Sequence, residues 1–81
     1  MNEKQLVKES LNGWIADNKN EVELSSVFNR QKDIADKYGI NALSYPKLVD
    51  TLRELNYKLY QYNGDCDCQI TYVKLPKRIA L

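Results

Sequence analysis

The spacing of apolar residues along this 81-residue chain changes near Tyr57, from mostly helical to strand-like, and this change constrains the fold more than any other feature. Before that point apolar residues recur every three or four positions, as on a helix with one buried side. After it, residues 58–62 and 69–75 are short runs rich in aromatic and branched side chains, typical of strands. We therefore predict an α+β fold with a C-terminal hairpin, and a chain this short leaves room for one domain, residues 1–81.

Three helices are predicted before the hairpin, the first two separated by a short strand. The first covers residues 3–18, and Gly13 within it predicts close packing against another element or a bend. Residues 21–24 alternate charged and apolar, as in a half-buried strand. The second helix is expected over residues 27–38, with Tyr38 on its buried side.

Helix-terminating residues support these boundaries. Ser25 and Ser26 are N-cap candidates for the second helix, because a serine hydroxyl accepts a hydrogen bond from a free backbone N–H of the first turn. Gly39 ends that helix, since glycine readily adopts the left-handed conformation. Ser44 is expected to cap the third helix, with Pro46 in its first turn. The expected core packs Leu48, Leu52 and Leu55 against Leu11, Ile15 and Ile34.

Charge sets limits on the partners of this chain. Twelve Lys and Arg against eleven Asp and Glu leave a net charge of +1, which excludes a histone-like polycationic protein. Any electrostatic function must therefore depend on local patches of charge. Residues 44–81 hold six cations against four carboxylates, too small an excess for strong sequence-independent DNA binding. No apolar run is long enough to cross a bilayer and the N-terminus lacks a signal peptide's apolar region, so we expect a soluble cytoplasmic protein without a membrane partner.

Enzyme chemistry finds little support in the sequence. The chain has no histidine, Gly-rich phosphate loop or nucleophile elbow, so we predict no enzymatic activity and no cofactor. Cys66 and Cys68 are two thiols where a structural zinc site usually takes four ligands, so metal would also need Asp65 and Asp67 or a second subunit. We expect these thiols to be reduced and incidental, with a metal or redox role as the weaker alternative.

The order of these elements, helix, strand, helix, capped helix and hairpin, resembles a winged-helix domain. That is a helix-turn-helix followed by a hairpin wing, and the resemblance extends from Leu6 to Leu75. The run from Leu48 to Tyr57, followed by an aromatic strand, is also similar to the small winged-helix modules of phage and plasmid primase-helicases. The resemblance implies binding of DNA.

The resemblance also implies positions for the contacts. The third helix corresponds to the recognition helix, whose exposed N-terminal side chains contact the major groove. Here these would be Ser44, Tyr45, Lys47, Thr51 and Arg53. The hairpin corresponds to the wing, which contacts the nucleic-acid backbone through basic residues. Asp65 and Asp67 at its tip depart from this pattern, because carboxylates there oppose phosphate. The basic residues available in and after the hairpin are Lys58, Lys74, Lys77 and Arg78.

Tyrosines gather in the same hairpin. Tyr60 and Tyr62 must share one strand face, and that face is the outer one if Leu59 points at the helices. Together with Tyr72, exposed rings beside lysines favour base stacking with single-stranded nucleic acid. The same surface suits a protein partner, and the simplest alternative is that the rings only pack against one another across the strands.

These features lead to one predicted function and two alternatives. The preferred function is a small non-enzymatic nucleic-acid-binding protein, with single-stranded DNA slightly favoured over duplex, accessory to replication or regulation of a phage or mobile element. The first alternative is an interaction module acting as a small subunit of a polymerase, primase or nuclease. The second is a homodimeric transcription regulator, in which two third helices would lie about 34 Å apart on a palindromic site.

Overall fold

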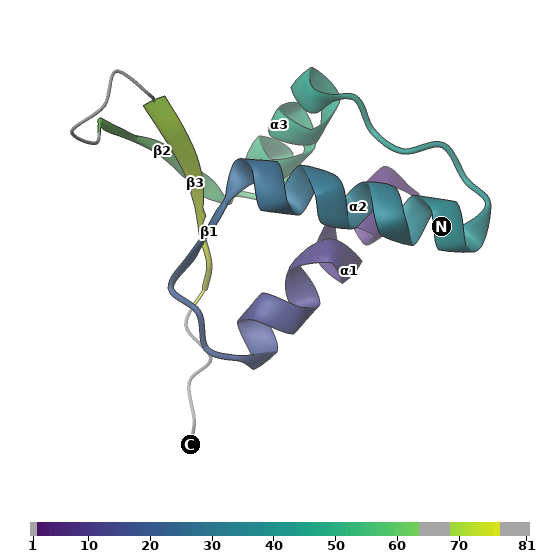
Figure 1. Cartoon of the computed structure of the whole chain (residues 1–81), viewed down its shortest axis with the longest axis horizontal. Coiled ribbons are helices and arrows are strands. Elements are labelled where there is room, and N and C mark those ends of the chain that lie inside the picture. The colour runs from purple at the N-terminus through teal and green to yellow at the C-terminus, as the bar shows by residue number, and fades with distance from the viewer. Residues whose placement is uncertain (1, 64–68, 77–81) are drawn as a thin grey trace.

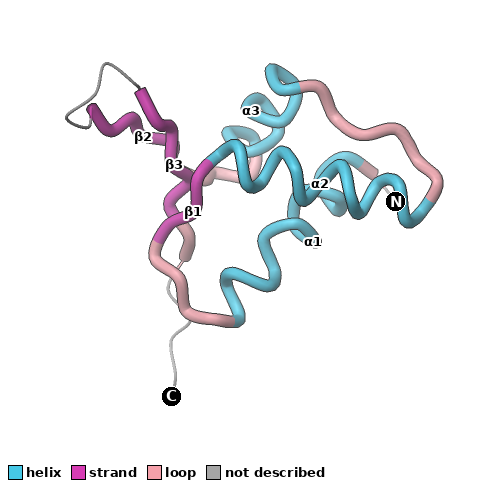
Figure 2. The backbone as a smooth tube through the Cα atoms, viewed as in Figure 1, coloured by secondary structure: helices cyan, strands magenta, loops and turns pink. Residues whose placement is uncertain are grey.

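The computed structural model describes residues 2–63 and 69–76, which form a small α+β fold of three helices and one three-stranded antiparallel sheet (Figures 1 and 2). The helices lie together and the sheet stands at one end of them. Residues 65–68, 77 and 78, for which the sequence suggested roles, lie outside the described part. The elements are α1 (Glu3–Ala16), β1 (Glu21–Glu23), α2 (Leu24–Tyr38), α3 (Tyr45–Glu54), β2 (Lys58–Asn63) and β3 (Gln69–Lys74).

Helix α1 begins with a reciprocal cap. The Asn2 side chain accepts a hydrogen bond from the Gln5 backbone N–H at 2.8 Å, and the Gln5 side chain accepts one from the Asn2 backbone at 3.1 Å. The helix ends at Ala16, two residues before the predicted end. The close packing predicted at Gly13 is wrong, because a Cβ built there meets nothing within 4 Å.

Helix α2 begins earlier than the sequence predicted. It starts at Leu24, directly after β1, so Ser25 and Ser26 lie inside its first turn and the N-cap position falls to Glu23, whose side chain makes no capping bond. Leu24 is only 2% exposed, and its burial in the core outweighs the capping preference of serine. Tyr38, predicted on the buried side, is 52% exposed.

The connection from α2 to α3 is fixed by one buried amide. Gly39 ends α2 at φ 67°, as predicted. The side chain of Gln31, fully buried, donates to the Leu43 carbonyl at 3.0 Å and accepts from the Leu43 N–H at 2.9 Å. Ser44 occupies the N-cap position of α3 without a side-chain hydrogen bond, and Pro46 lies in the first turn. A two-bond amide contact of this kind holds the start of α3 against α2.

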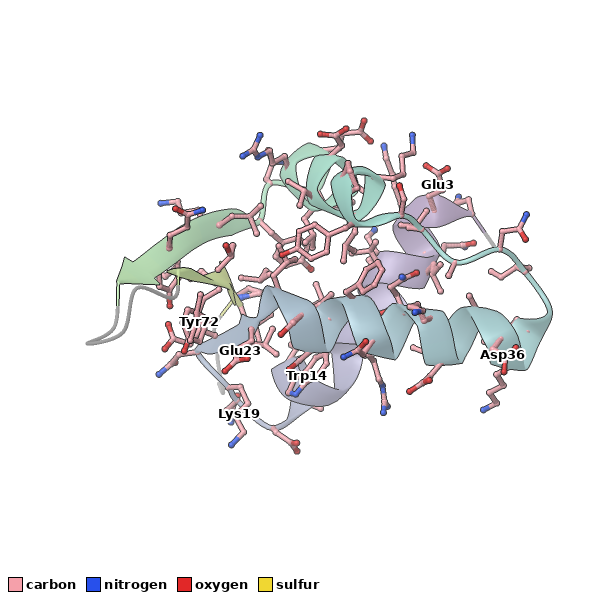
Figure 3. The ribbon with its side chains drawn as sticks, turned by 45° about the horizontal axis from the view of Figure 1, so that its top comes forward. Glu3, Trp14, Lys19, Glu23, Asp36 and Tyr72 are labelled. Carbon is pink, nitrogen blue, oxygen red and sulfur yellow. The ribbon has the colours of Figure 1, made fainter. Side chains whose placement is uncertain are left out.

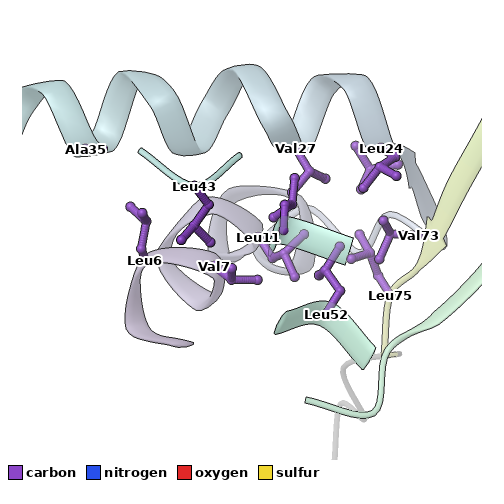
Figure 4. Close-up of a cluster of buried hydrophobic side chains, with 12 residues drawn as sticks. Leu6, Val7, Leu11, Leu24, Val27, Ala35, Leu43, Leu52, Val73 and Leu75 are labelled. Atoms are coloured by element: carbon purple, nitrogen blue, oxygen red, sulfur yellow. The ribbon is translucent and has the colours of Figure 1, made fainter. Parts of the chain in front are cut away.

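The core lies between the three helices and the inner face of the sheet (Figure 4). Leu48 and Leu52 of α3 are fully buried, as is Leu11 of α1, which confirms the centre of the predicted core. The remaining three predicted members, Leu55, Ile15 and Ile34, are half-buried and pack at its edge. The core residues are Leu6, Val7, Leu11, Val22, Leu24, Val27, Ala35, Leu43, Leu48, Leu52, Val73 and Leu75.

The sheet has the strand order β1-β3-β2, so β3 is its central strand. Val73 of β3 pairs with Val22 of β1 on one side and with Leu59 of β2 on the other, so the three form one row across the sheet. All three pack in or against the core. Side chains one residue away along each strand therefore belong to the opposite, outer face. Strand β1 pairs only with residues 72–74, so the rest of the β2–β3 hairpin continues beyond it, away from the helices (Figure 1).

Candidate functional site

The outer face of the sheet carries two lysines that lie directly opposite each other. Lys58 of β2 pairs with Lys74 of β3, and Glu21 of β1 pairs with Lys74 from its other side. Directly opposed side chains in an antiparallel pair have Cβ atoms about 5 Å apart, and like charges at that spacing destabilise the sheet. The contact between the two lysines is therefore unfavourable, and Glu21 on the other side of Lys74 offsets only part of it.

The next row of the outer face is aromatic. Tyr60 pairs with Tyr72, and their rings stack with centroids 5.8 Å apart and planes at 21°. Glu23 of β1 is the other neighbour of Tyr72, and the two lie side by side in Figure 3. Leu59 packs against the core, so Tyr60 lies on the outer face as its sequence position implied. Tyr62 pairs with Ile70 along the backbone, and its side chain lies outside the described part of the structure.

Arg53 adds a third cation from the last turn of α3. It lines an open cleft of about 690 Å³ together with Lys58 and Lys74, and Tyr57, Tyr60 and the acidic Glu21 line the same cleft. Within residues 2–63 and 69–76, no ion pair joins any of these three cations to a carboxylate. We call Arg53, Lys58 and Lys74 the cationic cluster. Its three positive charges converge on one surface, because α3 leads into β2 through only a short turn.

Tyr57, in that short turn, was not among the residues predicted to bind. Its side chain is half-buried and lines both the cleft described above and an adjoining one of about 510 Å³. Burial raises the pKa of the Tyr57 phenol above its usual value of 10.0. The phenol therefore stays protonated at neutral pH and brings no negative charge to the cationic cluster.

The first turn of α3 is arranged differently. The ring of Tyr45 packs edge-on against Phe28 at 5.5 Å, and Lys32 lies 5.2 Å from the centre of the Phe28 ring. Lys47 Nζ lies 3.4 Å from Glu3 Oε2, and both side chains are about half exposed, at 51% and 54%. These two predicted contact residues are thus already engaged within the chain. Glu3 and Tyr72 lie far apart in Figure 3.

The predicted binding residues therefore divide into two groups. Tyr60, Tyr72 and the cationic cluster lie together on and beside the hairpin. Tyr45 and Lys47 lie at the other end of α3, about 12 Å and about 9 Å along the helix axis from Arg53 by the rise of a helix. The prediction that Thr51 is exposed is wrong, because its side chain is buried and its hydroxyl donates to the Lys47 carbonyl. The predictions for Lys77 and Arg78 fall outside the described residues.

The exposed side of α3 carries no excess of positive charge. Lys47 and Arg53 are balanced by Asp50 and Glu54, and all four side chains are exposed. A helix with this balance presents little attraction to a phosphate backbone.

Sequence reasoning also missed the acidic side of the outer face. Glu21 and Glu23 come from the predicted strand at residues 21–24, and their spacing of two already placed both on one face. Their position beside Lys74 and Tyr72 depends on the pairing of β1 with β3, which the sequence pattern did not specify.

The described part of the chain contains neither a metal-binding cluster nor a membrane-spanning helix. Among the described residues no group of three or more His, Cys, Asp or Glu is placed to hold a metal ion. No helix there is both long and apolar enough to span a membrane. Cys66 and Cys68 lie outside the described residues. No protein-family model, curated protein sequence or solved structure matches this chain.

Proposed function

We propose that this chain is a winged-helix module that binds single-stranded nucleic acid, DNA in the first instance, on the outer face of the β2–β3 hairpin. The observation that carries the proposal is the opposed pair Lys58 and Lys74, joined by Arg53 around one cleft. Direct repulsion between two lysines costs stability, and a bound phosphate would relieve it. An accessory role in replication or regulation of a phage or mobile element is the setting in which we propose that it acts.

The element order supports the winged-helix part of the proposal. Helix, strand, two further helices and a hairpin follow one another, and β1 pairs with the strand β3 of that hairpin. The short connection from Gly39 to Ser44 is held by the bonds between Gln31 and Leu43. In a winged-helix domain α3 would be the recognition helix and the hairpin the wing.

The choice of single strands over duplex rests on charge and aromatic content. The exposed side of α3 carries balanced charge, and Lys47 is paired with Glu3, which disfavours α3 as the main contact with duplex. The hairpin instead offers the stacked pair Tyr60 and Tyr72 beside the cationic cluster. A base stacked on such a ring contributes about 1 to 3 kcal/mol and needs little net charge.

Titration with labelled single-stranded and duplex oligonucleotides at several salt concentrations tests the proposal. Three phosphate contacts to a single strand predict that log K falls with log salt at a slope of about −2. We expect tighter binding to the single strand, and a smaller slope for Arg53→Ala. Preference for duplex, or binding that does not depend on salt, would contradict the proposed site.

A second function, the interaction module, is favoured by one further observation. Ile70 lies on the outer face two residues from Tyr72, and its side chain is 39% exposed. An aliphatic residue beside stacked tyrosines suits a protein partner better than a polynucleotide. Ile70→Ser distinguishes the two functions. If the face binds nucleic acid, Ile70→Ser should bind oligonucleotides as tightly as the wild type does. If the face binds a protein, the wild type should bind no oligonucleotide, and Ile70→Ser should no longer co-purify with a replication protein.

A further inference from the structure

The outer face of the sheet is asymmetric in charge from one edge to the other. Strand β1 contributes Glu21 and Glu23, while β2 at the opposite edge contributes Lys58 and Tyr60. The central strand β3 lies between them with Lys74 and Tyr72. One edge is therefore acidic and the other basic, with the stacked rings next to both.

This asymmetry restricts how a single strand can lie on the face. Neighbouring strands are about 4.8 Å apart, so the whole face is only slightly wider than the screening length of about 8 Å at physiological salt. Phosphates over β1 would lie against two carboxylates, whereas phosphates over β2 would meet Lys58 and, beyond it, Arg53. The favourable arrangement puts the phosphates along β2 and the bases across β3, with their edges toward β1.

We propose that Glu23 selects among the pyrimidines that lie across Tyr60 and Tyr72, and that it favours cytosine, which carries an exocyclic amino group, over thymine, which carries a carbonyl oxygen at the same ring position. The inference rests on the proposed binding of single strands to this face. Glu23 is the direct neighbour of Tyr72, at the edge where the base edges would lie. A carboxylate accepts hydrogen bonds and cannot donate them, so it suits the cytosine amino group and repels the thymine O4.

The surroundings of Glu23 leave its carboxylate available for this contact. The side chain is exposed and makes no capping bond to α2. Ser25 Oγ donates to Glu23 Oε2 at 3.4 Å, which leaves Oε1 for a base. Glu21, in contrast, pairs with Lys74 in the row that contains no ring, so it repels phosphate but does not meet a stacked base.

The test compares short labelled oligomers of deoxycytidine and of thymidine, bound to the full chain at neutral pH. We expect the wild type to prefer the deoxycytidine oligomer by about five- to tenfold, the lower part of the range for one base contact. Glu23→Gln should bring the ratio of the two affinities close to one, because an amide both donates and accepts. The matched control Glu21→Gln should raise both affinities alike and keep the ratio.

Each other outcome decides against the inference. Equal affinity of the wild type for the two oligomers, or a ratio that survives Glu23→Gln, would overturn the role of Glu23 while leaving the proposed function in place. A ratio lost equally in Glu21→Gln would show that the effect is general repulsion and not base selection. If the wild type binds neither oligomer, the proposed function fails, and the inference fails with it.

Discussion

The two ends of α3 carry similar residues and use them differently. At its start, Tyr45 packs on Phe28 and Lys47 pairs with Glu3. At its end, Arg53 joins Lys58 and Lys74 in a cluster with no ion pair among the described residues. Exposure alone therefore does not mark a binding residue. Cations that the fold brings together without an ion pair among the described residues are the better candidates, because part of their mutual repulsion remains in the folded chain.

Packing explains why the two ends differ. The start of α3 contacts α2 through the rings of Tyr45 and Phe28, and it contacts α1 through the ion pair of Lys47 with Glu3. The end of α3 leads through a short turn into β2, whose pairing with β3 sets Lys58 opposite Lys74. One carboxylate does occur near the cluster: Glu21 lies opposite Lys74 and lines the same cleft, but among the described residues it forms no ion pair with any of the three cations. The contrast between the ends is thus a result of topology more than of composition.

A cavity in the core beneath α3 should have the largest effect on stability. Leu52 is fully buried between the helices and the sheet, so Leu52→Ala leaves a cavity and should lower the free energy of unfolding by about 2 to 5 kcal/mol. Chemical denaturation measures this loss. The exposed neighbour Glu54 gives a matched control, since Glu54→Ala should change stability by no more than about 0.5 kcal/mol. Equal stability of the two variants would contradict the three-helix core.

The two hydrogen bonds between the Gln31 side chain and the Leu43 backbone, just before α3, can be tested by a substitution whose effect depends on pH. Gln31→Glu keeps the shape of the side chain, but the ionised carboxylate cannot donate to the Leu43 carbonyl. We expect a loss of about 2 to 4 kcal/mol at neutral pH, measured by denaturation against the wild type.

The sign of its pH dependence follows from burial. Desolvation would raise the pKa of the new carboxyl in the folded state above its unfolded value, so the penalty should shrink as the pH falls toward the unfolded pKa, where a protonated acid can donate again. Gln61→Glu, at an exposed position of β2, should show no such recovery. Wild-type stability of Gln31→Glu at neutral pH would mean that Gln31 acts through its volume alone.

Removing the rings at the hairpin end should weaken binding without removing its salt dependence. The double variant Tyr60→Leu with Tyr72→Leu keeps an apolar outer face but loses the stacked pair. We expect affinity for single strands to fall by about 1 to 3 kcal/mol per stacked base, with nearly the same salt slope. Fluorescence anisotropy measures both quantities. Unchanged affinity in a folded variant would show that the two rings serve only to pack across the strands.

Relieving the lysine repulsion should have the smallest effect, and it acts in opposite directions on stability and binding. Lys58→Thr replaces one opposed lysine with a residue that favours strands, so we expect a gain of about 0.2 to 1 kcal/mol in stability. The same change should weaken oligonucleotide binding. Thermal unfolding measures the change in stability, and fluorescence anisotropy on the same sample measures the change in oligonucleotide affinity. A variant that is less stable than the wild type and binds oligonucleotides equally well would contradict a binding role for Lys58.

Much of the fold follows from local sequence signals, but the site depends on tertiary contacts. Gly39, Pro46 and the two aromatic runs mark their elements correctly because each acts through its own backbone or pattern. The start of α2 was predicted too late, because burial of Leu24 in the core outweighs the preference of Ser25 and Ser26 for the N-cap position. The ion pair of Lys47 with Glu3 joins distant parts of the chain, and no local pattern indicates it.

The central claim is that nucleic acid binds at the hairpin end of α3 and not at its start. It is tested most directly by measuring single-strand affinity against salt for Lys58→Gln and Lys47→Gln, two variants that each remove one charge from opposite ends. We predict that Lys58→Gln weakens binding and reduces the slope of log K against log salt by about 0.7, the value of one phosphate contact. Lys47→Gln should leave affinity and slope unchanged, because its charge is paired with Glu3. A loss in Lys47→Gln equal to or greater than that in Lys58→Gln would contradict the account.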